Sequence, residues 1–405
     1  SRLSCALALA LALAGGAHAH EPSPPATRVL GELRFPTSTK SPQAQAAFVE
    51  GMLYLHIFEY PSAAIAFRRA QALDPDFAMA YWGEAMSYTH PVWNQQDLAA
   101  GRAALAKLAP TPQARAAKAG TARERDFLHA VETLYGEGDK HARDLALLAE
   151  METMAKRYPR DDEVQLFLAL ALLGADEGKR DVPRFLRAAE IAKAVYRHNP
   201  QHPGAAHYWI HGMDDPEHAA GALEAANSLA KIAPDAGHSQ HMTSHIFIAL
   251  GRWQDVVDAN VAAERVVGAD YAAKGLPQYR CGHFSEWLEY AWLQQGREDE
   301  AWQLLGECER TGAAAVAWMR AHPGVPVGRI AKVEDMQQAA FGSLGYMRAM
   351  TLVDGSAHRK ELLALPVADG RGPELLFARG LAQADDGALD AAHATLEALR
   401  ALAKE

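Results

Sequence analysis

The chain is poor in cysteine, in aromatic residues and in positive charge, and each shortage excludes a class of protein. Three cysteines in 405 residues are too few for a scaffold built on disulfides. Forty Lys and Arg against 50 Asp and Glu give a net charge of −10, which argues against a nucleic-acid partner because such a partner requires a basic face. Aromatic residues make up only 8%. Ala and Leu are abundant instead, which favours helix over sheet.

The sequence also lacks the motifs of several common enzyme classes. It contains no P-loop, no dinucleotide-binding glycine pattern, no HExxH and no long β-type alternation. A chain of 405 residues is too long for one compact core and suits an extended repeat array.

The first 19 residues have the composition of a secretory signal peptide. Arg2 precedes the apolar run at 5–14, and the small-residue site Ala17-His18-Ala19 follows it. The run is too short to span a bilayer. We therefore expect export to the periplasm or beyond and no transmembrane segment. Cys281 and Cys308 would remain in the mature chain, either as one disulfide or as small buried apolar residues.

A period of 34 residues organises the chain after an extended lead-in at 20–43, in which we expect one short strand at 28–35. In the segment that starts at Ala44, positions 8, 11, 20, 24, 27 and 32 hold Gly51, Tyr54, Ala63, Phe67, Ala70 and Pro75. This set resembles the tetratricopeptide pattern. Small residues at positions 8 and 20 let two antiparallel helices approach closely, and the proline ends the second helix.

Further units of the same kind begin at residues 78, 203, 237 and 282, and two less regular helix pairs lie at 124–158 and 162–199. The register is lost after residue 312, and 374–403 has the pattern of a last degenerate pair. We therefore predict an all-α fold, a tetratricopeptide-like α-solenoid of stacked antiparallel helix pairs at 44–312 with a degenerate helical C-terminal cap at 313–405.

Histidine is concentrated in one part of this array. Eight of the 18 histidines lie between His198 and His245. His207 and His211 are four residues apart, as are His241 and His245, so each pair lies on one face of a helix. The two pairs are separated by 34 residues, which is one repeat. Stacking of repeats then brings the pairs side by side, on helices whose axes are about 8–10 Å apart.

The resemblance to tetratricopeptide proteins implies that positions 2, 5, 9, 12 and 13 of each first helix line a concave ligand groove. The candidate metal ligands at these positions are His207, His211, His238, His241, His245 and His283. The candidate ligand-binding residues are Trp82, Met86, His90, Asp214, Asp215 and Glu286.

Three interpretations of the histidines compete. They tie loops and helix ends together through hydrogen bonds and so rigidify the groove, they relay protons without a metal, or they bind a transition metal. Two imidazoles at i and i+4 can share one ion at about 2.0–2.1 Å, with a third imidazole or a carboxylate completing the set. Zinc is the first expectation, and copper and iron also accept imidazole ligands.

Longer motifs carry a more specific likeness. They are Phe35-Pro-Thr-Ser38, Met79-Ala-Tyr-Trp-Gly83, His90-Pro91, His202-Pro-Gly204, His207-Tyr-Trp-Ile-His211, Asp214-Asp-Pro216, Ile232-Ala-Pro234, His241-Met242, Ser244-His-Ile-Phe247 and Leu250-Gly-Arg-Trp253. Together they resemble a family of exported bacterial tetratricopeptide proteins of unassigned activity, over residues 30–310. The resemblance implies the fold, export and a recurring histidine-containing core, but no reaction. Thr39 and Phe77 stand where that family has cysteines.

Two functions follow as expectations. The first is an exported scaffold whose histidine-rich concave groove binds a peptide, a protein or a small molecule. The alternative is a metal-binding protein or metalloenzyme that uses the histidine cluster. Imidazole nitrogens that converge on common points favour the metal, whereas rings that each pair with backbone carbonyls favour the structural role.

Overall fold

The computed structural model describes residues 28–176, 178–365 and 372–404, and their regular structure is almost entirely helical. The predicted signal peptide at 1–19 and the first part of the lead-in lie outside the described residues. The described part contains 19 α-helices that pack in consecutive pairs. The predicted fold class, an all-α solenoid of helix pairs, is confirmed.

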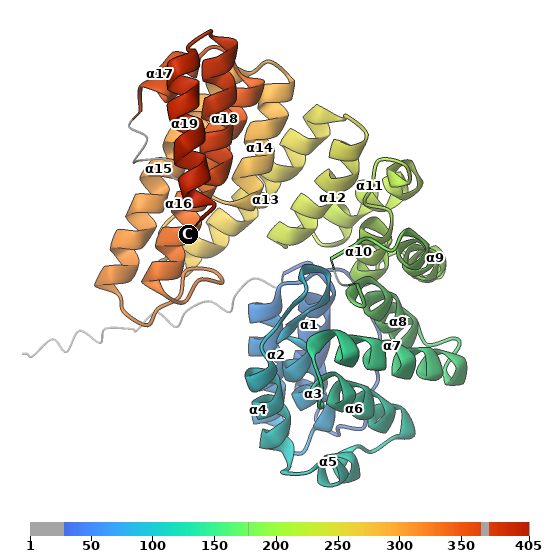
Figure 1. Cartoon of the computed structure of the whole chain (residues 1–405). Coiled ribbons are helices and arrows are strands. Elements are labelled where there is room, and N and C mark those ends of the chain that lie inside the picture. Colours follow the sequence, from blue (N-terminus) through green and yellow to red (C-terminus); the bar gives the residue numbers. More distant parts are fainter. Residues whose placement is uncertain (1–27, 177, 366–371, 405) are drawn as a thin grey trace, which may run out of the picture.

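The helices follow one another as packed pairs in a curved array (Figure 1). The first helices of the units are α1 (Pro42–His56), α3 (Ala78–Met86), α6 (Ala122–Leu134), α8 (Asp162–Gly174), α10 (Pro203–Gly212), α12 (Gly237–Ala249), α14 (His283–Gln294), α16 (Val333–Asp354) and α18 (Pro373–Asp385). The second helices are α2 (Tyr60–Leu73), α4 (Leu98–Leu108), α7 (Lys140–Arg157), α9 (Val182–His198), α11 (Leu223–Ile232), α13 (Trp253–Ala273), α15 (Glu298–Ala321) and α19 (Leu389–Leu402).

Short elements occupy the connections. These are α5 (Pro112–Lys118), α17 (Arg359–Ala364), the 3-10 turns η1 (Pro91–Trp93) and η2 (Ala219–Ala222), and the antiparallel strands β1 (Thr89–His90) and β2 (Gln95–Gln96). Polar side chains start several helices. Thr121 and Glu124, for example, form a reciprocal capping box at the beginning of α6.

Two glycines on the first helices, Gly51 at position 8 of its unit and Gly83 at position 6 of the next, allow the helices to pack closely. A Cβ atom on Gly51 would lie 2.6 Å from the ring of Phe67, and one on Gly83 would lie 2.4 Å from it. Both distances are below van der Waals contact, so any larger side chain would push the helices apart. The close approach buries Phe67 completely between α1, α2 and α3.

The array curves so far that its beginning meets its middle. Helix α1 contacts α10 directly, and Figure 1 shows the two next to each other where the blue N-terminal helices meet the green middle of the array. Residues 28–41, which precede α1, help to close this junction. They form no strand, contrary to the expectation for 28–35, because their backbone pairs with loops: Glu32 N–H donates to the carbonyl of Gln201 at 2.9 Å.

The C-terminal region continues the helical array. The predicted boundary after residue 312 lies inside α15, and helices follow as far as Leu402. A disulfide between Cys281 and Cys308 ties the start of α14 to α15. Among the described residues, no helix combines the length and the apolar character that crossing a membrane requires.

Candidate metal centre

Six of the predicted histidines converge from three first helices. They form two sets of three: a first triad of His207, His211 and His238, and a second triad of His241, His245 and His283. Within each triad, one nitrogen per ring can be chosen so that all three lie within 4.8 Å of one another. The triads adjoin, since the ring centroids of His211 and His245 are 6.2 Å apart.

The i, i+4 pair within each triad has the spacing of two ligands on one ion. The Nε2 atoms of His207 and His211 are 3.0 Å apart, and those of His241 and His245 are 3.2 Å apart. Two nitrogens bound at about 2.0–2.1 Å to a tetrahedral ion lie about 3.3 Å apart. Both pairs are therefore close to the geometry that a shared ion needs.

Hydrogen bonds fix which nitrogen the rings present. His207 Nδ1 donates to the backbone carbonyl of His56 at 2.7 Å, and His245 Nδ1 donates to Asp214 Oδ2 at 2.7 Å. A neutral imidazole that donates from Nδ1 keeps its lone pair on Nε2. Such contacts to the second nitrogen orient and tune metal-binding histidines in known sites.

The tautomer of His241 is fixed in the same way through Asn260. The Nδ2 atom of Asn260 donates to the carbonyl of Val256 at 2.9 Å, so its Oδ1 faces His241 Nδ1 at 2.7 Å and accepts a hydrogen bond. His241 and His245 thus turn two lone pairs toward each other. Two acceptors 3.2 Å apart repel unless a proton or a metal ion lies between them.

Burial favours the neutral form of His207, His211, His238 and His241, which is the form that binds a metal. Desolvation is the main cause, and it lowers the pKa of His207 to about 3. The pKa values of His211, His238 and His241 are also lowered well below the ordinary 6.5 by burial and by the neighbouring imidazoles. The buried Nε2 of His238 has no hydrogen-bond partner among the described residues.

Phe58 packs against the first triad from the turn between α1 and α2. Its ring centroid lies 4.4 Å from that of His207 and 5.5 Å from that of His211. Its backbone has φ 58°, a left-handed conformation that costs a bulky residue on the order of 1–3 kcal/mol. The turn holds this conformation because the ring is completely buried between the imidazoles and the aromatic residues beside them.

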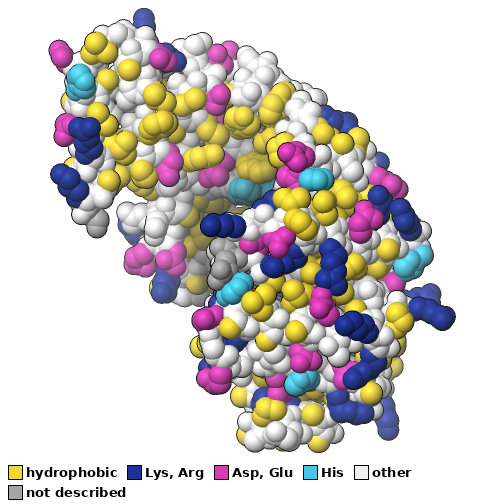
Figure 2. All heavy atoms as spheres, turned by 45° about the vertical axis from the view of Figure 1, so that its right-hand side comes forward, with side chains coloured by type: hydrophobic (Ala, Val, Ile, Leu, Met, Phe, Trp, Pro, Cys, Tyr) yellow, Lys and Arg dark blue, Asp and Glu magenta, His cyan; other side chains and the backbone are white. Residues whose placement is uncertain are grey.

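A cavity of about 620 Å³, here called the central cavity, opens beside the triads. Five of the six histidines line it; His207 lies behind them. Other lining residues come from α13, from the start of α2 and from the loop between α15 and α16, together with Arg28 and Trp93. Figure 2 shows the surface hollowed between the two halves of the molecule, with histidine side chains at the hollow.

A third group, His56, Glu163 and His202, lies completely buried behind the first triad. Here the side chains bond directly to one another: Glu163 accepts from His56 Nε2 at 2.8 Å and from His202 Nε2 at 3.1 Å. Burial alone would raise the pKa of Glu163, but the two imidazoles outweigh it and lower that pKa. The group therefore anchors His56, whose carbonyl orients His207.

The two predicted acidic residues after α10 have different partners. Asp214 accepts from His245, whereas Asp215 binds Arg180 and His218. Glu286 lies half-buried on α14, 4.0 Å from His283 Nδ1, and burial raises its pKa.

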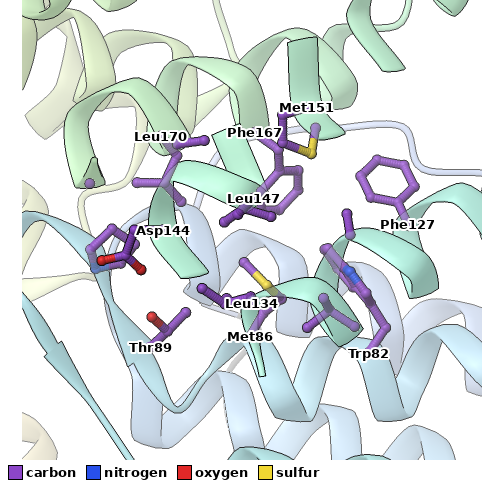
Figure 3. Close-up of a pocket in the computed structure, with 15 residues that line it drawn as sticks. Trp82, Met86, Thr89, Phe127, Leu134, Asp144, Leu147, Met151, Phe167 and Leu170 are labelled. Atoms are coloured by element: carbon purple, nitrogen blue, oxygen red, sulfur yellow. The ribbon is translucent and has the colours of Figure 1, made fainter. Parts of the chain in front are cut away.

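The predicted residues of the N-terminal units lie away from the triads. Trp82 and Met86 are buried and line an apolar cavity of only about 20 Å³, which has room for no more than a water molecule (Figure 3). His90 stacks on Tyr60 with ring centroids 4.1 Å apart. None of the three belongs to either triad.

Sequence reasoning missed the residues that support the triads, namely His56 as a carbonyl acceptor, Phe58, Glu163, His202 as a partner of Glu163, and Asn260. His202 belongs to the histidine-rich segment, which was the one signal for it. The others carry no local signal, because each acts through a contact made only by folding.

No family model matches this chain, and no curated protein matches it either. Among solved structures, the crystal structure of yeast Tom70 is similar with a TM-score of 0.32 and 10% identity, covering 89% of this chain and 85% of that one. A TM-score of this size carries no argument about fold or function. The contacts between consecutive helix pairs of this chain show a tetratricopeptide-like solenoid, an architecture typical of protein-binding scaffolds.

Proposed function

We propose that this chain is a helical-repeat protein that binds a transition metal through the six histidines of the two triads. The observation that carries the proposal is the contact between His241 and His245. Their Nε2 atoms are 3.2 Å apart, while both Nδ1 atoms are engaged with Asn260 and Asp214. A shared cation resolves this contact, and the remaining ring of the triad supplies a third ligand.

The ligand chemistry limits which metals fit. The triads offer imidazole alone, whereas Mg²⁺ and Ca²⁺ prefer oxygen ligands. Zinc, copper and iron accept imidazole. Zinc is the first choice, because three histidines are a known zinc ligand set that leaves the fourth position for water or a substrate.

Zinc binding to untagged protein tests the proposal. After loading with Zn²⁺ and dialysis, elemental analysis should find stoichiometric zinc in the native chain. The double variant His207→Ala/His241→Ala should lose it. The control is His198→Ala/His218→Ala, which removes two histidines that bind Asp162 and Asp215 outside the triads. A native protein that retains no zinc, copper or iron contradicts the proposal.

A second candidate function, binding of a partner segment, rests on a groove of about 530 Å³ between α14, α16 and α18. Tyr346, Val353 and Phe377 line it and are 45%, 55% and 58% exposed. The charged side chains of its lining are all acidic: Glu286, Asp354 and Glu374. The groove therefore suits an amphipathic segment with an apolar face and Lys or Arg at its edges.

Two amphipathic peptides of equal hydrophobicity, one with Lys and one with Glu on the polar face, distinguish this function. The Lys peptide should bind more tightly, and Phe377→Ser should weaken its binding at least tenfold. Equal binding of both peptides, or no loss in the variant, contradicts it. This measurement is independent of metal.

Export is part of the proposal and rests on the signal-like composition of residues 1–19. The disulfide between Cys281 and Cys308 supports it, because disulfides persist in oxidising compartments. Cell fractionation tests it: the full chain should lose its leader and leave the cytoplasm.

A further inference from the structure

Resting on the proposed function, we infer that the six histidines hold two transition-metal ions, one in each triad, which share a small anionic ligand on the side of the central cavity. The inference concerns stoichiometry and ligand class, whereas the proposed function requires only that metal binds.

The repeat builds both triads from equivalent parts. His207 and His211 of α10 combine with His238 at the start of α12, and His241 and His245 of α12 combine with His283 at the start of α14. An i, i+4 pair on one first helix thus meets the first-turn histidine of the next. Since stacked repeats place equivalent side chains equivalently, a triad that binds an ion implies a second one beside it.

One ion cannot satisfy both triads. Each contains its own close Nε2 pair, at 3.0 Å for His207 and His211 and at 3.2 Å for His241 and His245. An ion bound between the Nε2 atoms of His207 and His211 does not lie between the other close pair, that of His241 and His245. The lone pairs of His241 and His245 would then still face each other, as their bonds to Asn260 and Asp214 require.

The unpartnered Nε2 of His238 supports an ion in the first triad. It is buried and has no hydrogen-bond partner within the described part of the chain. A buried nitrogen without a partner is costly, and coordination to an ion beside His207 and His211 would satisfy it. The ring lies 5.1 Å from that of His207, centroid to centroid.

Geometry and charge indicate the shared ligand. Three neutral imidazoles leave each divalent ion with at least one open position, and five of the six rings line the central cavity. The cavity lining also carries three cations, Arg28, Lys274 and Arg329, against two carboxylates, Glu59 and Asp270. Two cationic metal sites beside this surplus of positive charge favour an anion of several atoms, such as azide or a small oxyanion, as the ligand that bridges them.

Zinc stoichiometry tests the number of ions. The native chain should retain two zinc ions, and His211→Gln and His245→Gln should each retain one. These substitutions keep a side chain of similar size, and the zinc left in the other triad reports that the variant is folded. One zinc in the native chain overturns the inference and leaves the proposed function intact, whereas no bound metal refutes the proposed function itself.

Copper resonance tests the shared ligand. Protein loaded with Cu²⁺ should lose most of its paramagnetic signal when azide is added, because bridged Cu²⁺ ions couple. His211→Gln and His245→Gln, each with one ion, should keep a full signal per copper in azide. A native protein that keeps the signal of two isolated Cu²⁺ ions with and without azide overturns the bridge.

Discussion

Asp214 accepts a hydrogen bond from Nδ1 of His245 at 2.7 Å and so connects the turn after α10 to α12. Its neighbour Asp215 points elsewhere, to Arg180 and His218. Of these two adjacent carboxylates, only Asp214 contacts a triad histidine. Substitutions at the two positions therefore separate an effect on the triad from an effect on the turn.

We expect Asp214→Asn to lower zinc affinity about 10-fold or more, because loss of the carboxylate weakens the basicity and orientation of His245. Asp215→Asn is the matched control and should leave the affinity unchanged. Competition against a chelator of known affinity provides the measurement. Equal losses in both variants would show that Asp214 acts on the turn and not on the metal.

Replacement of Glu163 by Gln should destabilise the protein by about 2–4 kcal/mol. His56 donates to Oε2 and His202 to Oε1 of this completely buried carboxylate, and an amide has only one oxygen, so its NH2 group would face one of the two donors. Urea unfolding of the metal-free protein measures the loss. Glu152→Gln, which removes an exposed ion pair with Arg187, should change stability by less than about 1 kcal/mol.

The raised pKa of Glu289 predicts that its replacement by Gln stabilises the folded protein to an extent that depends on pH. Burial raises its pKa well above 4.5, and Thr351 Oγ1 donates to its Oε1 at 2.6 Å. A raised carboxyl pKa stabilises the folded state fully below the unfolded pKa of about 4.5, and this stability is lost as pH rises toward the folded pKa.

Glu289→Gln avoids that loss because its amide does not ionise. The variant should equal the native protein in stability near pH 4 and become progressively more stable than it as the pH rises from 4.5 toward 7. Urea unfolding across this pH range measures the difference. A difference that is constant with pH would contradict a titrating Glu289.

Gly83→Ala should cost about 1–3 kcal/mol, since the added Cβ would lie 2.4 Å from the buried Phe67 ring. Gly306→Ala in α15 is the matched control: nothing lies within 4 Å of its added Cβ. There the substitution should be neutral or stabilising by up to about 1 kcal/mol. Thermal unfolding measures both. A Gly83 variant as stable as the native protein would show that the helices can separate at no cost.

The sequence predicted the fold, and the six histidines that it singled out lie together in the structure, whereas the residues that surround them were not predicted. The small residues Gly51 and Ala63 predicted the close approach of α1 and α2, because small side chains leave room for the facing helix. In the N-terminal units, the groove positions of the repeat did not predict an open ligand groove, because Trp82 and Met86 lie in a packed core. There the curvature of the array covers the face that a regular repeat would expose.

By itself, the sequence determined that His207 and His211, like His241 and His245, lie on one face of a helix, since helical geometry fixes the direction of residues four apart. Only the tertiary structure decided how the rings divide into triads and which nitrogen each presents. The carbonyl that orients His207 belongs to His56, 151 residues away, and Asn260 reaches His241 from a second helix. Such contacts depend on the curvature of the stacked pairs, which arises from packing summed over many residues and leaves no local pattern in the chain.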